Sequence, residues 1–294
     1  MTGLLELFSQ HAGLFAAVAF VFGLMVGSFL NVVIYRLPLI LDREWRAQCA
    51  ELDGKEVPES TLSLAHPRSH CPACKAPVKA WQNIPVISWL LLRGRCAHCG
   101  AAISVRYPLV ELATGLLSAA VAWHFGFGLA AAGALLLTWF LIPLTGIDLD
   151  HQLLPDALTL PLVWLGLLFS LGHHGADALP VSPRDAIIGA LAGYLFLWAI
   201  FHVFRLLTGK EGMGYGDFKL FAALGAWLGW QMLPLILLLS AAVGAAVGIA
   251  LVALRRQGRE VPIPYGPYLA GAGWIALMWG PQIVTGYLHF AGLR

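Results

Sequence analysis

Charged residues are scarce in this chain. Asp, Glu, Lys and Arg make up 12% of its 294 residues, against about a quarter in an average soluble domain. The formal net charge is only +2, too small for the basic surface that nucleic-acid binding needs. Five cysteines in a chain of this length do not make a disulfide scaffold. These shortages exclude a soluble globular enzyme, a nucleic-acid binder and a disulfide-stapled domain.

Long apolar segments take up most of the chain, which is 59% hydrophobic. A membrane-spanning helix needs about 20 largely apolar residues. The first such segment has no Lys or Arg before it, so we interpret it as a retained helix and not as a cleaved secretory signal. We predict an all-α polytopic membrane protein with about eight transmembrane helices, of which the fourth and sixth are short. The predicted spans are residues 12–37, 107–125, 129–147, 158–171, 186–206, 218–230, 234–254 and 268–290.

The lysines and arginines predict the orientation in the membrane, because cytoplasmic loops carry an excess of them. Ten of the 18 lie in residues 36–106, three in 205–219 and three in 255–259. With eight spans these 16 fall on one side, which we predict to be the cytoplasm, and only Arg184 and Arg294 fall opposite. Both termini are then outside. The predicted divisions are a first helix (1–37), a cytoplasmic domain (38–106) and a seven-helix membrane domain (107–294).

Two C-x-x-C pairs stand in the cytoplasmic stretch, Cys71-Pro-Ala-Cys74 and Cys96-Ala-His-Cys99. Their separation is close to that of four-thiolate zinc sites. Four ligands fill a tetrahedral zinc site and leave no open position, so such a zinc is structural. The alternative is four reduced thiols without metal, since disulfides do not persist in the cytoplasm. We favour a zinc held by Cys71, Cys74, Cys96 and Cys99, and expect Cys49 to be a free thiol.

Carboxylates at the edges of spans are the second chemical signal, because ionisable groups there are costly and mark function. Asp148 follows the third span, and Asp217 opens the sixth in Gly-Met-Gly-Tyr-Gly-Asp-Phe-Lys. The predicted topology puts both on the cytoplasmic side. Two aspartates that share a site cannot both ionise easily, and such a pair can activate a water against a peptide carbonyl. Helix capping or a loop role remains the alternative for each.

Two other functions fit part of this pattern. A proton-coupled transporter also places carboxylates in its spans, but usually at mid-membrane and in related halves of the chain. The carboxylates here lie at span edges, and no internal repeat is evident. A zinc-bearing scaffold without chemistry would leave the glycine-rich segment before Asp217 unexplained.

Several motifs together resemble one known family. The Gly-Tyr-Gly-Asp217 segment is similar to the G-x-G-D motif of intramembrane aspartyl proteases. Ile147-Asp148 with Leu154-Pro155-Asp156 resembles the partner segment of the type IV prepilin peptidases. The Gly27-Ser-Phe-Leu-Asn31-Val-Val-Ile-Tyr-Arg36-Leu-Pro38 run resembles that family's N-terminal signature, and the cysteine pairs resemble its cytoplasmic domain.

The resemblance implies a bifunctional enzyme of the bacterial inner membrane. It would cleave the basic leader from type IV prepilins and type II secretion pseudopilins, with Asp148 and Asp217 as the catalytic aspartates. It would then methylate the new N-terminal amine with S-adenosylmethionine. No dinucleotide or Walker fingerprint marks a cofactor-binding residue. The implied partners are prepilins and the lipid bilayer.

Overall fold

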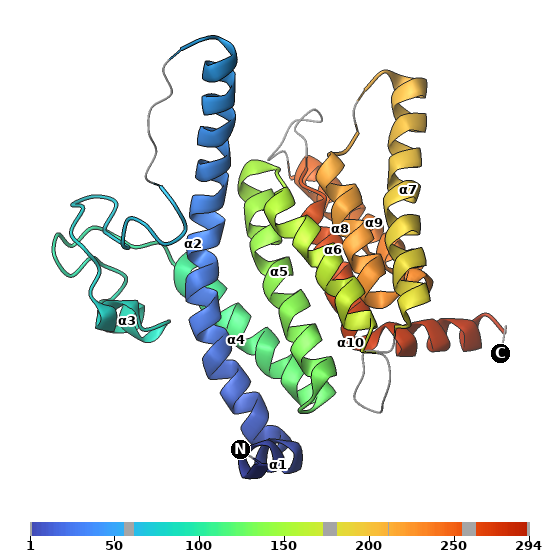
Figure 1. The fold of residues 1–294 in the computed structure, drawn as a ribbon, viewed down its shortest axis with the longest axis horizontal. Coiled ribbons are helices and arrows are strands. Elements are labelled where there is room, and N and C mark those ends of the chain that lie inside the picture. Colours follow the sequence, from blue (N-terminus) through green and yellow to red (C-terminus); the bar gives the residue numbers. More distant parts are fainter. Residues whose placement is uncertain (1, 56–61, 173–180, 211, 255–262, 293–294) are drawn as a thin grey trace. The chain divides into compact units, whose positions relative to one another are not determined.

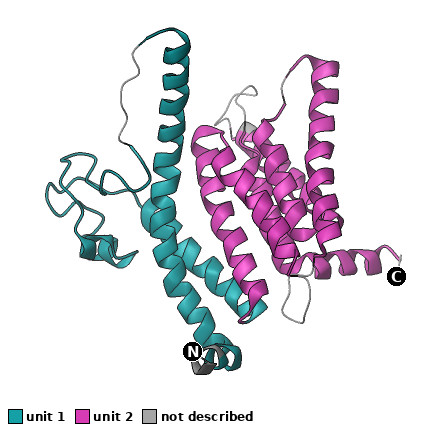
Figure 2. Cartoon of the chain, in the orientation of Figure 1, with its two compact units in different colours: residues 1–126 teal, residues 127–294 magenta. Residues whose placement is uncertain are grey.

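The fold was examined in a computed structural model, which describes residues 2–55, 62–172, 181–210, 212–254 and 263–292. The described residues are helical with connecting loops and contain no β-strand, as expected for the all-α class. The chain divides into two compact units, residues 1–126 and residues 127–294 (Figure 2). The functional division at residues 37 and 106 that the sequence suggests stays a prediction.

The first unit is built on two long helices that pack against each other (Figure 1). Two glycines of α2, Gly23 and Gly27, lie against α4, where a Cβ on Gly27 would stand 2.8 Å from the Cα of Glu111. Small residues four positions apart let membrane helices approach this closely. The helices of this unit are α1 (Thr2–Gln10), α2 (Ala12–Leu52), α3 (Ile87–Leu91) and α4 (Arg106–Phe125), with a 3-10 turn at Ala80–Asn83.

The first long helix does not end where the apolar run ends. We expected the span to stop at Leu37, before Pro38, but α2 continues to Leu52. A proline in a helix removes one backbone hydrogen bond and does not by itself end the helix. The polar extension is supported by an ion pair one turn apart, Arg46 with Asp42 at 3.0 Å. The transmembrane helix and the polar segment after it are therefore one continuous helix.

The second unit packs its helices around α8. Helices α6, α7 and α10 all contact α8, and α10 also contacts α5 and α9. Most of α8 is buried, and Trp227 near its end donates its indole N–H to the carbonyl of Leu162 at 2.8 Å. The helices are α5 (Leu129–His151), α6 (Asp156–Ser170), α7 (Pro183–Thr208), α8 (Tyr215–Leu228), α9 (Leu233–Ala253) and α10 (Gly266–Phe290), with a 3-10 turn at Trp230–Met232.

All eight predicted spans lie on helices and extend at most two residues beyond them, although several of the helices are longer than the predicted spans. Five helical segments are long and apolar enough to cross a membrane: α2, α4, α5, α7 and the segment Trp230–Leu251. The other three predicted spans lie on α6, α8 and α10. Helices α6 and α8 are short, with 15 and 14 residues, and the glycines, prolines and tryptophans of α10 lower its mean hydropathy. At 1.5 Å per residue, α8 is about 21 Å long, shorter than the hydrocarbon core. Its burial among its neighbours compensates for that short length.

Candidate active site

Asp217 lies in the first turn of α8 and is 7% exposed. Its Oδ2 accepts the backbone N–H of Gly214, the residue that precedes the helix, at 3.2 Å. Its Oδ1 is buried and accepts no hydrogen bond from any residue that the structure describes. An unsatisfied buried carboxylate oxygen is costly, and such atoms gather at functional sites. This unsatisfied oxygen makes Asp217 a candidate catalytic residue.

Asp148 lies in the last turn of α5 and is 5% exposed. Its Oδ2 accepts the backbone N–H of Gly266, the first residue of α10, at 2.9 Å. Asp148 lies close enough to Asp217 to act on it electrostatically. The structure thus brings together the two aspartates that the sequence singled out, from helices far apart in the chain.

The glycine directly before Asp217 is explained by space. A Cβ on Gly216 would lie 2.6 Å from the Cβ of Leu154 and 3.2 Å from its carbonyl oxygen. Leu154 belongs to the connection between α5 and α6, which follows Asp148. Gly216 therefore lets the start of α8 approach the segment that carries Asp148. Of the two glycines in the Gly-Tyr-Gly-Asp pattern, Gly216 is the one that close packing between α8 and this connection requires.

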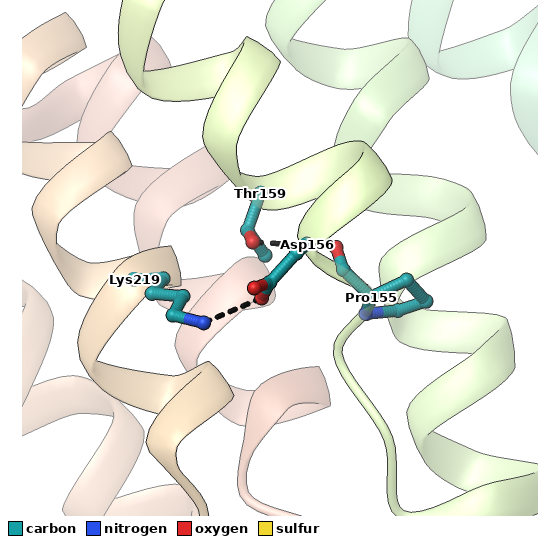
Figure 3. Close-up of polar contacts among 4 residues, drawn as sticks. All are labelled: Pro155, Asp156, Thr159 and Lys219. Carbon is teal, nitrogen blue, oxygen red and sulfur yellow. Dashed lines mark hydrogen bonds and ion pairs between the residues drawn. The ribbon is translucent and has the colours of Figure 1, made fainter. Parts of the chain in front are cut away.

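A third carboxylate near the site is engaged in an ion pair. Asp156, the first residue of α6, receives Lys219 of α8 with an Nζ–Oδ1 distance of 2.6 Å (Figure 3). On the same turn of α6, Thr159 donates its hydroxyl to the carbonyl of Pro155. Asp156 does not cap its helix, because the N-cap residue is Pro155 and no side chain caps this terminus. Asp156 instead ties the start of α6 to the helix that carries Asp217.

Polar residues of the N-terminal signature have structural contacts within the first unit. Asn31 donates its amide to the carbonyl of Tyr107 at 3.0 Å. Arg36, 8% exposed, donates to the carbonyls of Ser63 and Leu64. The signature therefore fixes α2 to α4 and to the loop that follows α2.

Glu111, an ionisable residue inside the predicted span 107–125, also contacts the loop. Its Oε2 accepts the backbone N–H of Val86 at 2.7 Å. Val86 has a φ of 61°, which is unusual for a β-branched residue. The contact from Glu111 thus anchors a strained turn directly before α3.

The four paired cysteines come together in one cluster, with their sulfurs all within 4.8 Å of one another. The Sγ atoms of Cys71 and Cys99 are 3.8 Å apart. A tetrahedral site with Zn–S bonds of about 2.3 Å has S–S edges of about 3.8 Å, so this set fits one tetrahedral metal. Backbone hydrogen bonds from Cys74 and Ala73 lower the pKa of the Cys71 thiol to about 6, which favours the thiolate that metals bind.

The two cysteine pairs have the same backbone turn. Lys75 donates its N–H to the carbonyl of Cys71, and Gly100 donates to the carbonyl of Cys96, both at 2.9 Å. Each donor lies four residues after the first cysteine of its pair and has a positive φ, 60° and 73°. Two matching turns present two sulfurs each, so these four residues could hold a metal ion.

Sequence reasoning missed the side of the site formed by the start of α10. Gly266 donates to Asp148, and the hydroxyl of the preceding residue, Tyr265, lies 2.7 Å from that of Ser240 on α9. The available signal was the Pro-Tyr-Gly-Pro turn directly before the last span. It carries no charged side chain, so a search for ionisable groups passes over it.

Two family models and several full-length relatives match this chain. Residues 21–125 match the model of the bacterial peptidase A24 N-terminal domain, and residues 135–249 match that of the type IV leader peptidase family. Proteins named prepilin leader peptidase/N-methyltransferase are similar over nearly their whole length. That of Aeromonas hydrophila is 58% identical over 98% of this chain and 99% of its own. That of Pseudomonas aeruginosa is 54% identical over 99% of both chains. No solved structure matches.

Proposed function

Because the chain belongs to the type IV leader peptidase family, we propose that it is a membrane aspartic endopeptidase that removes the basic leader from type IV prepilins and type II secretion pseudopilins. It then N-methylates the new N-terminal residue with S-adenosylmethionine as the methyl donor. The names of its relatives, which cover both activities, support this assignment.

The observation that carries the peptidase assignment is the buried pair Asp148 and Asp217, with the Asp217 Oδ1 that accepts no hydrogen bond from the described residues. Two neighbouring carboxyl groups share a proton, because both cannot ionise easily. The ionised group takes a proton from a water that attacks the scissile carbonyl. The protonated group donates to the carbonyl oxygen and, as the C–N bond breaks, a proton reaches the leaving amine. No covalent intermediate is required.

The placement of the aspartates suits a substrate whose apolar helix lies in the membrane. Asp148 is in the last turn of α5 and Asp217 in the first turn of α8, so both lie at helix ends. From the distribution of Lys and Arg we propose that these ends lie on the cytoplasmic side of a bacterial inner membrane, with both termini periplasmic. A leader that is basic and cytoplasmic would then present its junction with the apolar helix to the two aspartates.

We assign Cys71, Cys74, Cys96 and Cys99 to a structural zinc. The four thiolates complete a tetrahedral shell, so the metal would contribute folding energy to the loop between α2 and α4 and would not bind substrate. The methyl group comes from S-adenosylmethionine, to which we assign no residue. Both aspartates belong to the second unit, residues 127–294.

The test is a reaction of the purified protein in detergent with a purified prepilin. Cleavage shifts the pilin band on a gel, and mass spectrometry of the product reads the added methyl group only when S-adenosylmethionine is present. Cleavage without methylation would limit the function to the peptidase. An unchanged prepilin would contradict the proposal.

A further inference from the structure

The N-terminus of α10 makes a direct contact with one candidate catalytic aspartate. Gly266 donates its backbone N–H to Oδ2 of Asp148 at 2.9 Å, across 118 positions of sequence and in a buried environment. A hydrogen bond from a backbone amide to a carboxylate is stronger than one between neutral groups and fixes the rotation of the carboxyl. The orientation of Asp148 therefore depends on where α10 begins.

Space, and not backbone conformation, requires glycine at position 266. Its φ is not in the left-handed region, so other residues could adopt this conformation. A Cβ on Gly266, however, would lie 2.7 Å from Oδ2 of Asp148 and 3.1 Å from Cδ2 of Leu154. Real Cβ atoms essentially never approach a neighbour as closely as 2.7 Å. Any side chain at position 266 would displace the Asp148 carboxyl or the helix terminus.

The residue before Gly266 anchors the same terminus to another helix. The Tyr265 hydroxyl lies 2.7 Å from the Oγ of Ser240, a fully buried residue of α9. Tyr265 also lies close enough to Asp217 for the two groups to interact electrostatically. The start of α10 thus contacts Asp148 through its backbone and lies near Asp217 through its tyrosine.

We propose that Gly266 and Tyr265 are positioning residues for the peptidase. Gly266 holds one oxygen of Asp148 through its N–H, and the Tyr265–Ser240 hydrogen bond fixes the helix terminus from which that N–H projects. This inference rests on the proposed function, in which Asp148 is catalytic. It adds a third structural element, the start of α10, to a site that otherwise consists of the ends of α5 and α8.

The first test compares Gly266→Ala with Gly271→Ala on the same helix, where a Cβ would meet no atom within 4 Å. With purified protein and a prepilin, we expect Gly266→Ala to lower kcat at least about tenfold with little change in KM, because a small displacement of a catalytic group is costly. Gly271→Ala should cleave at the parent rate. An unchanged kcat for Gly266→Ala would overturn the proposal.

A second variant separates displacement of Asp148 from simple crowding. Leu154→Ala removes the other atom that the new methyl group would approach, but leaves Asp148 in place. The Gly266→Ala/Leu154→Ala double variant should have a lower kcat than Leu154→Ala alone, by the same factor that separates Gly266→Ala from the parent. Recovery of the kcat would assign the defect to packing and would also overturn the proposal.

Tyr265→Phe and Ser240→Ala decide the matter if Gly266→Ala does not fold. Each removes one partner of the Tyr265–Ser240 hydrogen bond, worth about 1 kcal/mol, and Ser240→Ala also removes a hydrogen bond to the carbonyl of Leu237 within α9. Each should therefore lower kcat up to about fivefold, and the double variant should lower it no further than Ser240→Ala. Parent kcat in both would overturn the proposal. Asp148→Asn, run in parallel, keeps the two claims distinct. If it cleaves normally, the proposed function fails; if it alone is inactive, only this inference fails.

Discussion

The ion pair between Lys219 and Asp156 offers a quantitative test of how α6 is held against α8. The Nζ–Oδ1 distance is 2.6 Å, and the side chains are 24% and 58% exposed. Exposed ion pairs contribute about 0.2–1 kcal/mol, and the partial burial of Lys219 places this pair near the upper end. The expected coupling energy is therefore about 1 kcal/mol. Since Lys219 follows Asp217 by two residues on α8, loss of the pair should also slow leader cleavage, by at most about fivefold.

The perturbation is a double-mutant cycle with Asp156→Asn and Lys219→Met, in which each change removes a charge and keeps most of the side-chain volume. Unfolding free energies are measured by denaturant titration in mixed micelles, and cleavage rates are measured on the same preparations. The exposed pair Arg46 and Asp42, 80% and 50% exposed, is the matched control. Its coupling should not exceed about 0.5 kcal/mol, and its variants should cleave at the parent rate.

Additive effects at Asp156 and Lys219, within the roughly 0.3–0.5 kcal/mol scatter of independent sites, would refute the reasoning. The pair would then be a surface contact without energetic weight. A coupling that persists at high salt would indicate a more buried pair than these exposures imply, because screening weakens exposed charges.

Further predictions concern the metal and the helix packing. We expect metal analysis to find one zinc per chain. The Cys71→Ser/Cys96→Ser variant should lose this zinc together with thermal stability, whereas Cys49→Ser should retain both. Protein that is purified without chelator and holds no zinc would contradict the assignment. Gly225→Ala should destabilise the second unit by about 1–3 kcal/mol in denaturant titration, because the new Cβ would overlap a backbone carbonyl of α7, whereas Gly271→Ala should be neutral. Equal stability of these two glycine variants would argue against close packing of α7 on α8.

The helices were predictable because apolar runs of span length have few alternatives to helix in a membrane. The end of the first helix could not be predicted in this way. The apolar run stops at Leu37 and Pro38, but the helix continues through polar residues to Leu52. The length of the apolar run depends on the thickness of the hydrocarbon core. The end of the helix depends on local backbone and side-chain contacts.

The two aspartates could be chosen as candidates for a related reason. An ionisable side chain at the edge of an apolar run is conspicuous, so the sequence alone marks Asp148 and Asp217 as candidate catalytic residues. The amide of Gly266 could not be chosen in this way, because a backbone N–H is present at nearly every position and only the three-dimensional fold aims this one at Asp148. No residue type in the sequence identifies a long-range contact made by the backbone.

The electrostatic roles of the two aspartates also depend on the fold. From helix ends alone, the partial negative charge at the C-terminus of α5 disfavours ionised Asp148, and the positive N-terminus of α8 favours ionised Asp217. The structure adds the N-terminus of α10, whose first N–H meets Asp148. Asp217 accepts a backbone N–H from the start of its own helix, whereas Asp148 accepts one from the start of a different helix, α10. The dipole of α5 is therefore not the only helix dipole that acts on Asp148.

The central claim is that Asp148 and Asp217 together perform the cleavage, and the rate of leader removal by single Asn variants tests it most directly. Purified Asp148→Asn and Asp217→Asn are each compared with the parent and with Asp150→Asn, an exposed aspartate at the end of α5. We predict that each of the first two loses at least about 100-fold in rate while remaining folded in detergent, because each removes one member of an acid–base pair. Asp150→Asn should lose much less. Cleavage near the parent rate by either Asp148→Asn or Asp217→Asn would contradict the account.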